Sequence, residues 1–497
     1  MNFKNIILCT AFALTHALSS HAETSGDIYL QHCGSCHGQN RLGISGPALF
    51  KDGFDRKTTI ENISDIIKNG RPSTQMPAFS KKLSDSQIEQ LAQYIFTPLS
   101  DEQLNWDIKN IESSRRVYSH TPEESQLPKA TDPLNLLTVV EIEDHHISIV
   151  DGDSLKTLKR LSTQRGVHGG AKYSPDGQYM YLSSRDGWVE KFDMHAMKRI
   201  AQVRAAINAR NIAVSSDGRY ILVGNYYPKN FVLLDSKDLR PIKIFPATSN
   251  DHLASRVSAV YNAPPRNSFI IALKDIKEIW ELSYLGDPSK NALRKIPIEQ
   301  AMENFTFNQD YTVLMGTAHQ NTIGEVLNLD TGKLLSKLNI EGMPHLGSGI
   351  TFTYKNERVL AAPNMSKGLI SIISLKDWRT IKTIKTKGPG FFMRSHETSP
   401  YIWADVFFGP NKDLIHVIDK KTLKIIKTLR PSPNKTAAHI EFDRHGKYAF
   451  VSIWEDDGAL VVYNAKNLTE IKRIPMRKPS GKYNVYNKIN FSEGTSH

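Results

Sequence analysis

A repeat of about 45 residues runs through the sequence from residue 131 onward. Each unit contains an alternating apolar strand, a polar turn, a second strand that ends near an acidic or polar residue, and a short basic strand. Equivalent ends fall at eight positions: Asp151, Asp193, Asp235, Leu282, Asp330, Ser374, Asp419 and Asn464. Eight units of four short strands predict an eight-bladed β-propeller.

Turn residues agree with this architecture. Asp176-Gly177 and Asp217-Gly218 lie between strand patterns, as expected for hairpin turns. A solenoid is the alternative for a repeat of this length. A closed ring is favoured because it leaves no exposed strand edge, and the segment 482–487 is available to complete the ring.

A second feature lies near the N-terminus, where the sequence reads Cys33-Gly-Ser-Cys36-His37. Two thiols two residues apart, followed at once by histidine, are the attachment signature of a c-type haem. The thiols bond to the porphyrin, and the imidazole of His37 becomes an axial ligand of the iron. The alternatives are a redox dithiol or half of a zinc site. Zinc needs further ligands at matched spacing, and the third cysteine, Cys9, lies in the leader.

Residues 23–100 are expected to form an α-helical domain around this motif. Ser84 is a candidate N-cap for a last helix over 85–95, which places apolar residues on one face. The domain resembles small class I cytochromes c. In those proteins a methionine before proline supplies the second axial ligand, so the resemblance implies this role for Met76.

The whole chain is therefore predicted to be an α plus all-β protein of two domains. A class I cytochrome c over 23–100 is followed by a polar linker over 101–130 and a propeller over 131–497. Residues 1–22 have the basic start, short apolar run and small-residue cleavage site of a secretory signal. Haem c is attached outside the cytoplasm, so both signals predict a periplasmic protein.

The charge and composition limit the kinds of molecule that this protein is expected to bind. The net charge is +12, but the basic residues are scattered and form no arginine-rich run. Nucleic-acid binding is therefore not expected, whereas a basic surface suits acidic redox partners or a polycarboxylate ligand. No later segment approaches the ~18 continuous apolar residues that a membrane span requires.

A periplasmic cytochrome c fused to an eight-bladed propeller resembles the cytochrome cd1 nitrite reductase family. The resemblance covers nearly all of the mature chain and is carried by short patches, which are Val167-His168, Arg185-Asp186-Gly187, Ala209-Arg210, Tyr226-Tyr227-Pro228, Arg256-Val257, Met343-Pro344-His345, Ser395-His396, Ser452-Ile453-Trp454 and 481–487. In that family the propeller channel holds haem d1, a tetrapyrrole rich in carboxylates. The resemblance therefore implies a second, non-covalent tetrapyrrole in this chain.

Three positions refine what the resemblance implies. His168 matches the ligand of the haem d1 iron, and His345 matches one of two histidines on the opposite side of the ring. The second of those two is expected after Arg256, at about the position of Pro264. Nitrite reduction consumes protons and needs charged donors at the anion, so loss of one imidazole weighs against nitrite reductase activity, which stays the alternative.

The same departure resembles a biosynthetic paralogue of the reductase. The resemblance then implies oxidation of dihydro-haem d1 to haem d1, in which a propionate becomes an acrylate with loss of two electrons and two protons. His345 is the candidate base, polariser or second iron ligand. Haem c and a periplasmic acceptor would receive the electrons, and cytochrome cd1 nitrite reductase would receive the product. A haem d1 carrier for that reductase is a further alternative.

Further residues are expected around the tetrapyrrole. Guanidinium groups bind carboxylates through paired hydrogen bonds, so the arginines of the patches are candidate carboxylate ligands, with blade-to-blade salt bridges as the alternative. One more histidine and two aromatic residues are candidates for the same pocket, although buried residues of these types often only pack. The full set is Arg185, Arg210, Arg256, Arg394, His396, Tyr226 and Trp454.

Overall fold

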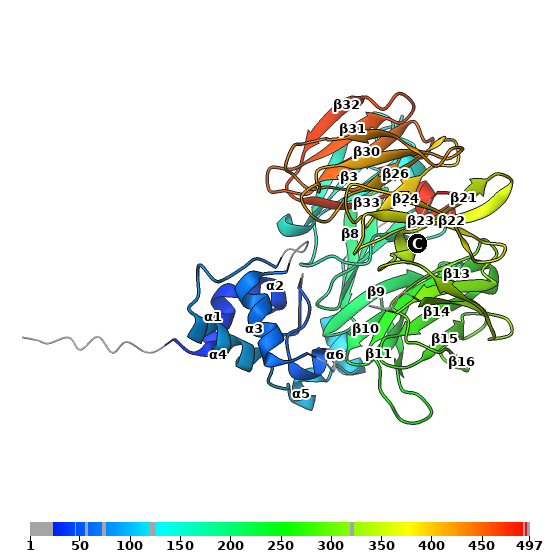
Figure 1. The fold of residues 1–497 in the computed structure, drawn as a ribbon. Coiled ribbons are helices and arrows are strands. Elements are labelled where there is room, and N and C mark those ends of the chain that lie inside the picture. Colours follow the sequence, from blue (N-terminus) through cyan, green and yellow to red (C-terminus); the bar gives the residue numbers. More distant parts are fainter. Residues whose placement is uncertain are drawn as a thin grey trace, which may run out of the picture.

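The computed structural model describes residues 23–44, 46–54, 58–71, 76–118, 125–318, 323–490 and 493–494. The predicted signal, residues 1–22, lies outside the described residues, as do residues 72–75 before Met76. The described chain forms a small helical domain beside a large ring of sheets (Figure 1).

The helical domain is built on capped amphipathic helices. Its helices are α1 (Ser25–His32), α2 (Gly34–His37), α3 (Ile60–Asn69) and α4 (Asp85–Ile95), with a 3-10 turn at Lys51–Gly53. Ser84 accepts a hydrogen bond from the backbone of Gln87, whose side chain returns to the backbone of Ser84, so the predicted N-cap is a full capping box. The predicted apolar face of α4 is buried against α1 and α3.

The segment expected to be a linker contains regular structure. It forms α5 (Asp101–Leu104), α6 (Ile108–Ser114) and the short strand β1 (Arg116–Val117), which adds an outer strand to a propeller sheet by pairing with β8 (Lys198–Arg204). Trp106 donates its indole N–H to the carbonyl of Arg204 at 2.9 Å. The sequence shows no sustained period here because each element is too short to produce one.

The described residues of the propeller form eight antiparallel sheets. Blade 1 contains β33 (Pro479–Asn484), β2 (Leu136–Glu141), β3 (His146–Asp151) and β4 (Thr157–Ser162). Blade 2 contains β5 (Lys172–Tyr173), β6 (Tyr179–Ser183), β7 (Trp188–Asp193) and β8. Blade 3 contains β9 (Asn208–Val214), β10 (Tyr220–Tyr227), β11 (Asn230–Asp235) and β12 (Pro241–Pro246). Blade 4 contains β13 (Val257–Ala263), β14 (Ser268–Leu273), β15 (Glu278–Ser283) and β16 (Arg294–Pro297).

The second half of the ring repeats this plan. Blade 5 contains β17 (Asn304–Phe307), β18 (Val313–Thr317), β19 (Ile323–Asn328) and β20 (Leu334–Asn339). Blade 6 contains β21 (Ile350–Tyr354), β22 (Glu357–Pro363), β23 (Leu369–Ser374) and β24 (Thr380–Lys385). Blade 7 contains β25 (Met393–Ser395), β26 (Tyr401–Asp405), β27 (Ile415–Asp419) and β28 (Ile425–Leu429). Blade 8 contains β29 (Ala437–Phe442), β30 (Tyr448–Ile453), β31 (Ala459–Asn464) and β32 (Glu470–Pro475).

The sequence repeat and the blades share one register. The repeat ends lie at or within two residues of the end of the third strand in every blade. The predicted closure is confirmed, because β33 pairs with β2, with Tyr483 opposite Thr138 and Lys482 opposite Val139. A short helix, α7 (Val485–Asn490), follows the closing strand. The ring is thus sealed by the two ends of the propeller segment.

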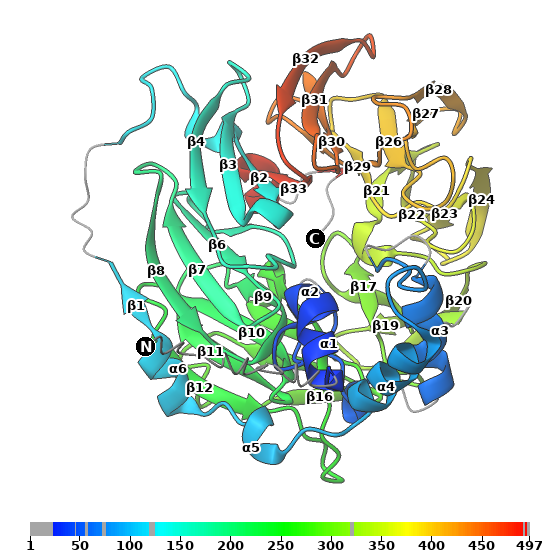
Figure 2. The same ribbon diagram turned by 90° about the vertical axis from the view of Figure 1, so that its left-hand side faces the viewer.

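Apolar side chains pack between neighbouring blades. One core cluster joins blades 3 and 4 around the fully buried Trp280, and another joins blades 7 and 8 around Trp403. Strands of the inner layers are apolar on both faces because each sheet is covered by a blade on either side. This packing arranges the inner strands around a common axis, and Figure 2 shows the ring from the side of the cytochrome domain. The region along this axis, between the inner strands, is called the channel.

The cytochrome domain sits over one end of this channel. Asn208, the first residue of β9, donates to the carbonyl of Leu42 at 2.6 Å. The ring of Phe50 packs on Tyr227 with centroids 4.8 Å apart. We call this end of the channel the near end. Ser215 follows the last residue of β9 and so lies at the opposite, far end.

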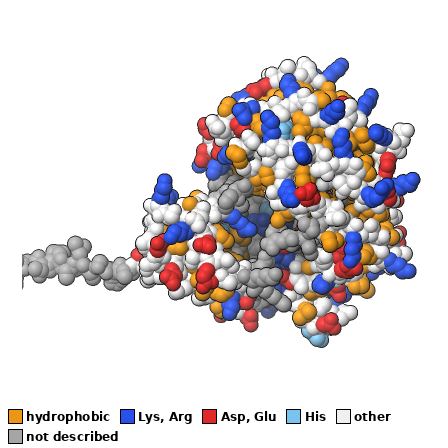
Figure 3. Space-filling model, in the orientation of Figure 1, with side chains coloured by type: hydrophobic (Ala, Val, Ile, Leu, Met, Phe, Trp, Pro, Cys, Tyr) orange, Lys and Arg blue, Asp and Glu red, His pale blue; other side chains and the backbone are white. Residues whose placement is uncertain are grey.

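Basic and acidic side chains are interspersed on the face that Figure 3 shows. That pattern agrees with the scattered charge expected from the sequence. Among the described residues, no helix has both the length and the apolar character that crossing a bilayer requires.

Candidate functional site

The haem attachment motif forms one helical turn. Cys33 ends α1 and Cys36 lies in α2, with both thiols free. The His37 Nδ1 atom lies 2.8 Å from the carbonyl oxygen of Pro47. This nitrogen must donate to the carbonyl, so the Nε2 atom presents its lone pair, as an iron ligand requires. The residues present therefore fit a covalently bound haem c.

Gly46 makes room for this imidazole. A Cβ atom at position 46 would lie 2.6 Å from the His37 ring, well inside van der Waals contact. Met76 is partly buried against the core of the domain, near α1 and α3. Its backbone carbonyl accepts a hydrogen bond from Arg71 at 3.0 Å. The position is compatible with the predicted axial role, which stays a prediction.

The near end of the channel brings His168 together with two predicted arginines. The His168 Nδ1 atom lies 2.9 Å from the carbonyl oxygen of Arg210, so it donates there and leaves Nε2 as an acceptor. Arg185 Nη2 and Arg210 Nη1 point at that Nε2 atom from 2.9 and 3.0 Å. Burial, followed by the two cations, holds the pKa of His168 well below its ordinary value, so the imidazole is neutral.

Arg185 and Arg210 form a cationic group in a poorly solvated place. Burial and the charge of Arg210 lower the pKa of Arg185 to about 10. The Arg185 Nε atom is buried and has no hydrogen-bond partner. Burying two cations, one of which has an N–H without a hydrogen-bond partner, costs free energy unless an anion lies nearby. The pair is therefore suited to bind a ligand carboxylate.

Tyr226, another candidate for the tetrapyrrole pocket, lies beside these arginines. Burial acts to raise its pKa, but the charges of Arg210, Arg185 and Lys274 outweigh burial and lower the pKa. Its hydroxyl is thus a strong hydrogen-bond donor at the wall of the site. The ring also lies 5.9 Å from the guanidinium carbon of Arg256.

His345 occupies the loop before β21 and faces the same channel. Its Nδ1 atom lies 3.0 Å from the carbonyl of Phe391, on which the imidazole ring also packs at 4.2 Å between centroids. The Nε2 atom therefore presents a lone pair. Burial lowers the pKa of His345 to about 4, so it is a neutral acceptor near pH 7.

A third histidine, His439 on β29, also lies at the channel. Asp405 accepts hydrogen bonds from the backbone N–H groups of Phe391 at 2.8 Å, Phe392 at 3.0 Å and His439 at 3.2 Å. One carboxylate thus fixes the segments that position both His345 and His439. Burial raises the pKa of Asp405 to about 6.

His439 is surrounded by residues from the ring closure. Its ring lies 5.4 Å from that of Tyr483, and the Lys482 ammonium group donates to its carbonyl. Burial and the charges of Lys482, Arg394 and Lys488 hold its pKa well below the ordinary value. Its backbone φ of 51° is in the left-handed region, which is uncommon for a residue other than glycine.

The sequence did not single out Lys172, Lys482, Tyr483 or Lys488 as site residues, and the structure places them on inner strands or on α7. Lys482 is fully buried, which is rare for a lysine, but only the structure shows that burial. Alternation alone does not show which face of a strand meets the channel.

Two predicted residues have other partners in the structure. Arg256 donates to Asp275 through Nη2 at 2.6 Å and to the carbonyl of Gly53 in the cytochrome domain at 2.9 Å. Arg256 therefore links the two domains, and its guanidinium group is already paired within the protein. His396 uses both ring nitrogens, on Thr398 Oγ1 at 2.8 Å and on the carbonyl of Arg444 at 3.1 Å. It is a satisfied histidine between blades.

The other two candidates differ in surroundings. Arg394 is buried on β25 with its Nε atom 3.6 Å from Glu441 Oε2, so the alternative of a blade-to-blade salt bridge holds at least in part. Trp454 packs on Phe407 at 5.6 Å, at the edge of an aromatic cluster that includes Phe391 and Phe392. Its buried indole N–H has no partner, which leaves a donor for a ligand.

Tyr261 on β13 lies beside the loop that carries His345. A Cβ atom at Gly347 would lie 3.5 Å from the Tyr261 hydroxyl, which places the phenol next to the loop that carries His345. Pro264 begins a 3-10 turn after β13 (Pro264–Arg266), toward the far end. The described strand β13 (Val257–Ala263) thus brings a phenol, and no imidazole, beside the loop of His345.

The geometry defines a class: a c-type cytochrome joined to a propeller whose channel collects neutral imidazoles and buried cations for a polycarboxylate tetrapyrrole. The cytochrome D1 haem-domain family matches residues 131–488, and the family of cbb3-type cytochrome c oxidase subunit III matches residues 21–95. The chain belongs to the cytochrome D1 haem-domain family.

Particular relatives are more informative. The dihydro-haem d1 dehydrogenase of Pseudomonas aeruginosa is 48% identical over 97% of this chain and 98% of that protein. A solved structure of the dihydro-haem d1 dehydrogenase NirN in complex with DHE has a TM-score of 0.81 and 46% identity, over 94% of this chain and 100% of that one. The nitrite reductase of Stutzerimonas stutzeri is 25% identical over 94% of this chain and 93% of that protein.

Proposed function

We propose that this chain is a periplasmic dihydro-haem d1 dehydrogenase. It takes dihydro-haem d1 into the propeller channel, and the –CH2–CH2– of one propionate becomes the –CH=CH– of an acrylate. Two C–H bonds break, two protons and two electrons leave, and the carboxylate is unchanged. The similarity to a dehydrogenase of this kind over the full chain supports this substrate.

One observation carries the proposal: the arrangement of His168, Arg185 and Arg210. His168 would hold the iron through Nε2, and Arg185 and Arg210, which contact that atom here, would then be available to other acceptors. The carboxylates of the tetrapyrrole supply those acceptors, and charge-assisted paired hydrogen bonds form in a poorly solvated site. Metal binding and carboxylate binding are coupled through the same three residues.

His345 supplies the channel with a neutral imidazole that can accept a proton. His345 presents its Nε2 lone pair at pH 7 because burial lowers its pKa to about 4. It accepts a proton from the side chain or binds the iron from the second face. The phenol of Tyr261 and the aromatic cluster exclude water on this side, which protects a partly oxidised substrate.

Haem c, when attached, supplies a one-electron carrier on the near side of the channel. His37 and Met76 are the proposed axial ligands, and Cys33 and Cys36 the attachment points. The docking of the cytochrome domain by Arg256 and Asn208 fixes this carrier over the near end. A periplasmic electron acceptor takes the electrons onward, and cytochrome cd1 nitrite reductase is the proposed recipient of haem d1.

The test uses the purified protein with haem c attached. It is incubated with dihydro-haem d1 without oxygen, and the extracted tetrapyrrole is weighed by mass spectrometry while the haem c spectrum is followed. The expected product is lighter by two hydrogens, with reduction of haem c. Unchanged mass despite tight binding would leave only a carrier, and rapid nitric oxide formation from nitrite would identify a reductase.

A further inference from the structure

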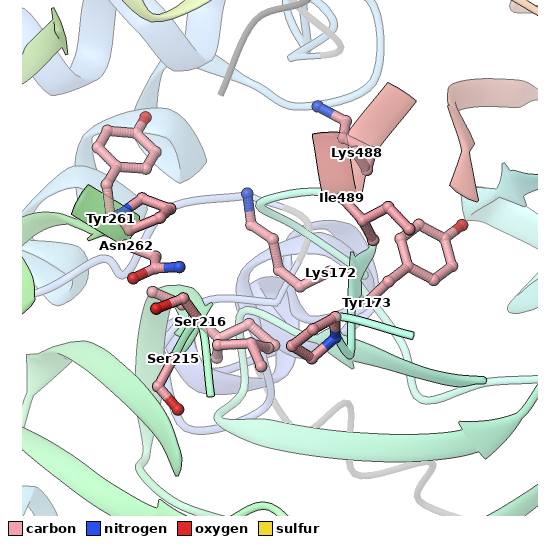
Figure 4. A pocket seen from close by; sticks show the side chains of 13 residues that line it. Lys172, Tyr173, Ser215, Ser216, Tyr261, Asn262, Lys488 and Ile489 are labelled. Atoms are coloured by element: carbon pink, nitrogen blue, oxygen red, sulfur yellow. The ribbon is translucent and has the colours of Figure 1, made fainter. Parts of the chain in front are cut away.

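The two ends of the channel are filled differently. Toward the far end lies a cavity of about 180 Å³, lined by residues of β5, β9, β13 and α7 (Figure 4). At the near end, aromatic rings pack directly on two channel histidines. The ring centroid of Phe391 lies 4.2 Å from that of His345, and the centroid of Phe392 lies 4.6 Å from that of His439. The far end thus leaves room, whereas the near end holds its imidazoles in place.

Asp405 lies behind these rings. It is the last residue of β26 and is only 2% exposed. Its Oδ1 atom accepts hydrogen bonds from the backbone N–H groups of Phe391 and Phe392, and its Oδ2 atom accepts from that of His439. A single carboxylate on blade 7 therefore connects the segment before β25 with β29 of blade 8.

The segment before β25 sets the orientation of His345. The carbonyl of Phe391 accepts a hydrogen bond from His345 Nδ1 at 3.0 Å, while the N–H of the same residue donates to Asp405 at 2.8 Å. A shift of this backbone away from Asp405 therefore moves the acceptor of the imidazole. That acceptor also fixes the tautomer, because the bond at Nδ1 determines which ring nitrogen carries the proton.

The main chain of His439 is held from both sides. Its N–H donates to Asp405 at 3.2 Å, and its carbonyl accepts from the ammonium group of Lys482 on β33. Between these two contacts the backbone has the left-handed φ of 51°. The two charged side chains thus stabilise a conformation that a residue with a side chain seldom adopts.

Gly390 permits the close approach to Asp405. A Cβ atom at position 390 would lie 2.6 Å from the backbone carbonyl oxygen of Asp405, well inside van der Waals contact. A side chain there pushes the segment that carries Phe391 away from β26. The contact between Asp405 and this segment can therefore be disturbed from either partner.

We propose that Asp405 is a positioning residue that aligns His345 and His439 with the bound tetrapyrrole. The inference rests on the proposed function and deepens it, because it assigns the alignment to a carboxylate that bonds the main chain. Three backbone N–H groups converge on this anion, and such charge-assisted hydrogen bonds are strong. Asp405 thereby fixes two imidazoles relative to each other, as a near-attack geometry requires. The contacts at His168 lie on another blade and do not depend on it.

The experiment compares Asp405→Asn with wild type in the oxidation of dihydro-haem d1, both with haem c attached. An amide has one acceptor oxygen and a donor nitrogen, so one of the two segments loses its acceptor. The kcat is expected to fall at least about tenfold, while the dissociation constant of the substrate stays within about threefold. Wild-type kcat in folded Asp405→Asn would overturn the proposal.

Asp443→Asn is the matched control. Asp443 is 1% exposed, and its carboxylate also accepts from two backbone N–H groups, those of His445 at 3.0 Å and Tyr448 at 2.5 Å. These bonds lie within one turn after β29, at the far end of the blade. Asp443→Asn is expected to lower the midpoint of thermal unfolding without changing kcat. An equal fall of kcat in both variants would make Asp405 a merely structural residue.

A second variant disturbs the same contact and keeps the carboxylate. Gly390→Ala is expected to lower kcat with retained affinity, and it decides the question if Asp405→Asn does not fold. The double variant Asp405→Asn with His345→Gln adds a test of mechanism. Its loss of kcat is expected to be smaller than the product of the two single losses, because both changes act on one imidazole. Fully multiplicative losses would contradict positioning of His345.

The two proposals fail in different ways. If wild type binds dihydro-haem d1 but leaves its mass unchanged, the dehydrogenase is wrong. The absorption spectrum of the bound tetrapyrrole then still tests the positioning role. Asp405→Asn and Gly390→Ala are expected to shift its bands, because His345 faces the channel, whereas Asp443→Asn leaves them unchanged. Bands identical to those of wild type in the first two variants would overturn the role of Asp405.

Discussion

The haem attachment site takes its three reactive groups from five consecutive residues, Cys33 to His37, whereas the channel site draws His168, His345 and His439 from three different blades. A single helical turn is enough to build the first. The second exists only when the ring closes and the inner strands converge. The comparison teaches that one site is a property of a segment and the other a property of the whole fold.

Removal of haem c tests whether the attachment site and the channel site are independent, and it is expected to have the largest effect on turnover. Cys33→Ala with Cys36→Ala removes the attachment points, and multiple-turnover oxidation is expected to fall by at least about a hundredfold because the electron carrier is gone. The affinity for dihydro-haem d1 is expected to stay within about twofold, since no thiol faces the channel. Absorption spectra of haem c and tetrapyrrole titrations measure both. Sustained turnover in this variant would show that haem c is not the electron route.

A variant of His168 tests whether the channel site can be lost while the haem c site stays intact. His168→Ala is expected to lower the affinity for dihydro-haem d1 by about 10- to 100-fold, as loss of a metal ligand does. The haem c spectrum is expected to be unchanged. His396→Gln is the matched control, because His396 is also a histidine packed between blades but has both nitrogens bonded elsewhere. Equal loss of affinity in both variants would point to a packing role for His168.

The same contrast explains which features could be predicted from the sequence and which could not. The attachment motif and the ring were predictable because spacing alone encodes them: five residues for the haem, and eight repeats of about 45 residues for the blades. His168 and His345 were found through the resemblance. Arg256 and His396 were assigned to the same pocket, yet their partners are Asp275 and a blade loop. Sequence gives the type of side chain but not the direction in which a loop aims it.

Substitution of Arg185 or Arg210 is expected to have a smaller effect on the affinity of the channel for dihydro-haem d1. Arg185→Gln or Arg210→Gln is expected to weaken dihydro-haem d1 binding by about tenfold, equivalent to ~1.5 kcal/mol for one charged hydrogen bond. Neutral glutamine keeps length but not charge. Titration at several salt concentrations measures the affinity, and its salt dependence should become shallower in each variant. An unchanged affinity would mean that the carboxylates bind elsewhere.

Arg256 joins the two sites that the comparison separates. Arg256→Met is expected to slow haem c reduction by less than about tenfold, because the carrier loses its fixed position over the channel. Dihydro-haem d1 affinity is expected to be unchanged. Stopped-flow absorption at the haem c bands gives the rate. If affinity falls and the rate per bound substrate does not, Arg256 contacts the ligand instead.

The last test concerns the free energy of unfolding and its dependence on pH. His345 has a folded pKa of about 4 against an ordinary value of about 6.5. As the pH falls through this window the unfolded chain takes up a proton first, so the free energy of unfolding decreases toward pH 4. His345→Gln is expected to make that decrease shallower, as chemical denaturation at pH 7, 6, 5 and 4 would measure. Identical slopes would exclude a buried neutral imidazole at this position.

The closing strand β33 has a consequence for biogenesis. Its residues and those of α7 are among the last in the chain, and they supply Lys482, Tyr483 and Lys488 to the channel. A polypeptide that stops early lacks the final blade strand and the groups that meet the substrate at once. Closure of the ring and assembly of this part of the channel therefore depend on the same short segment.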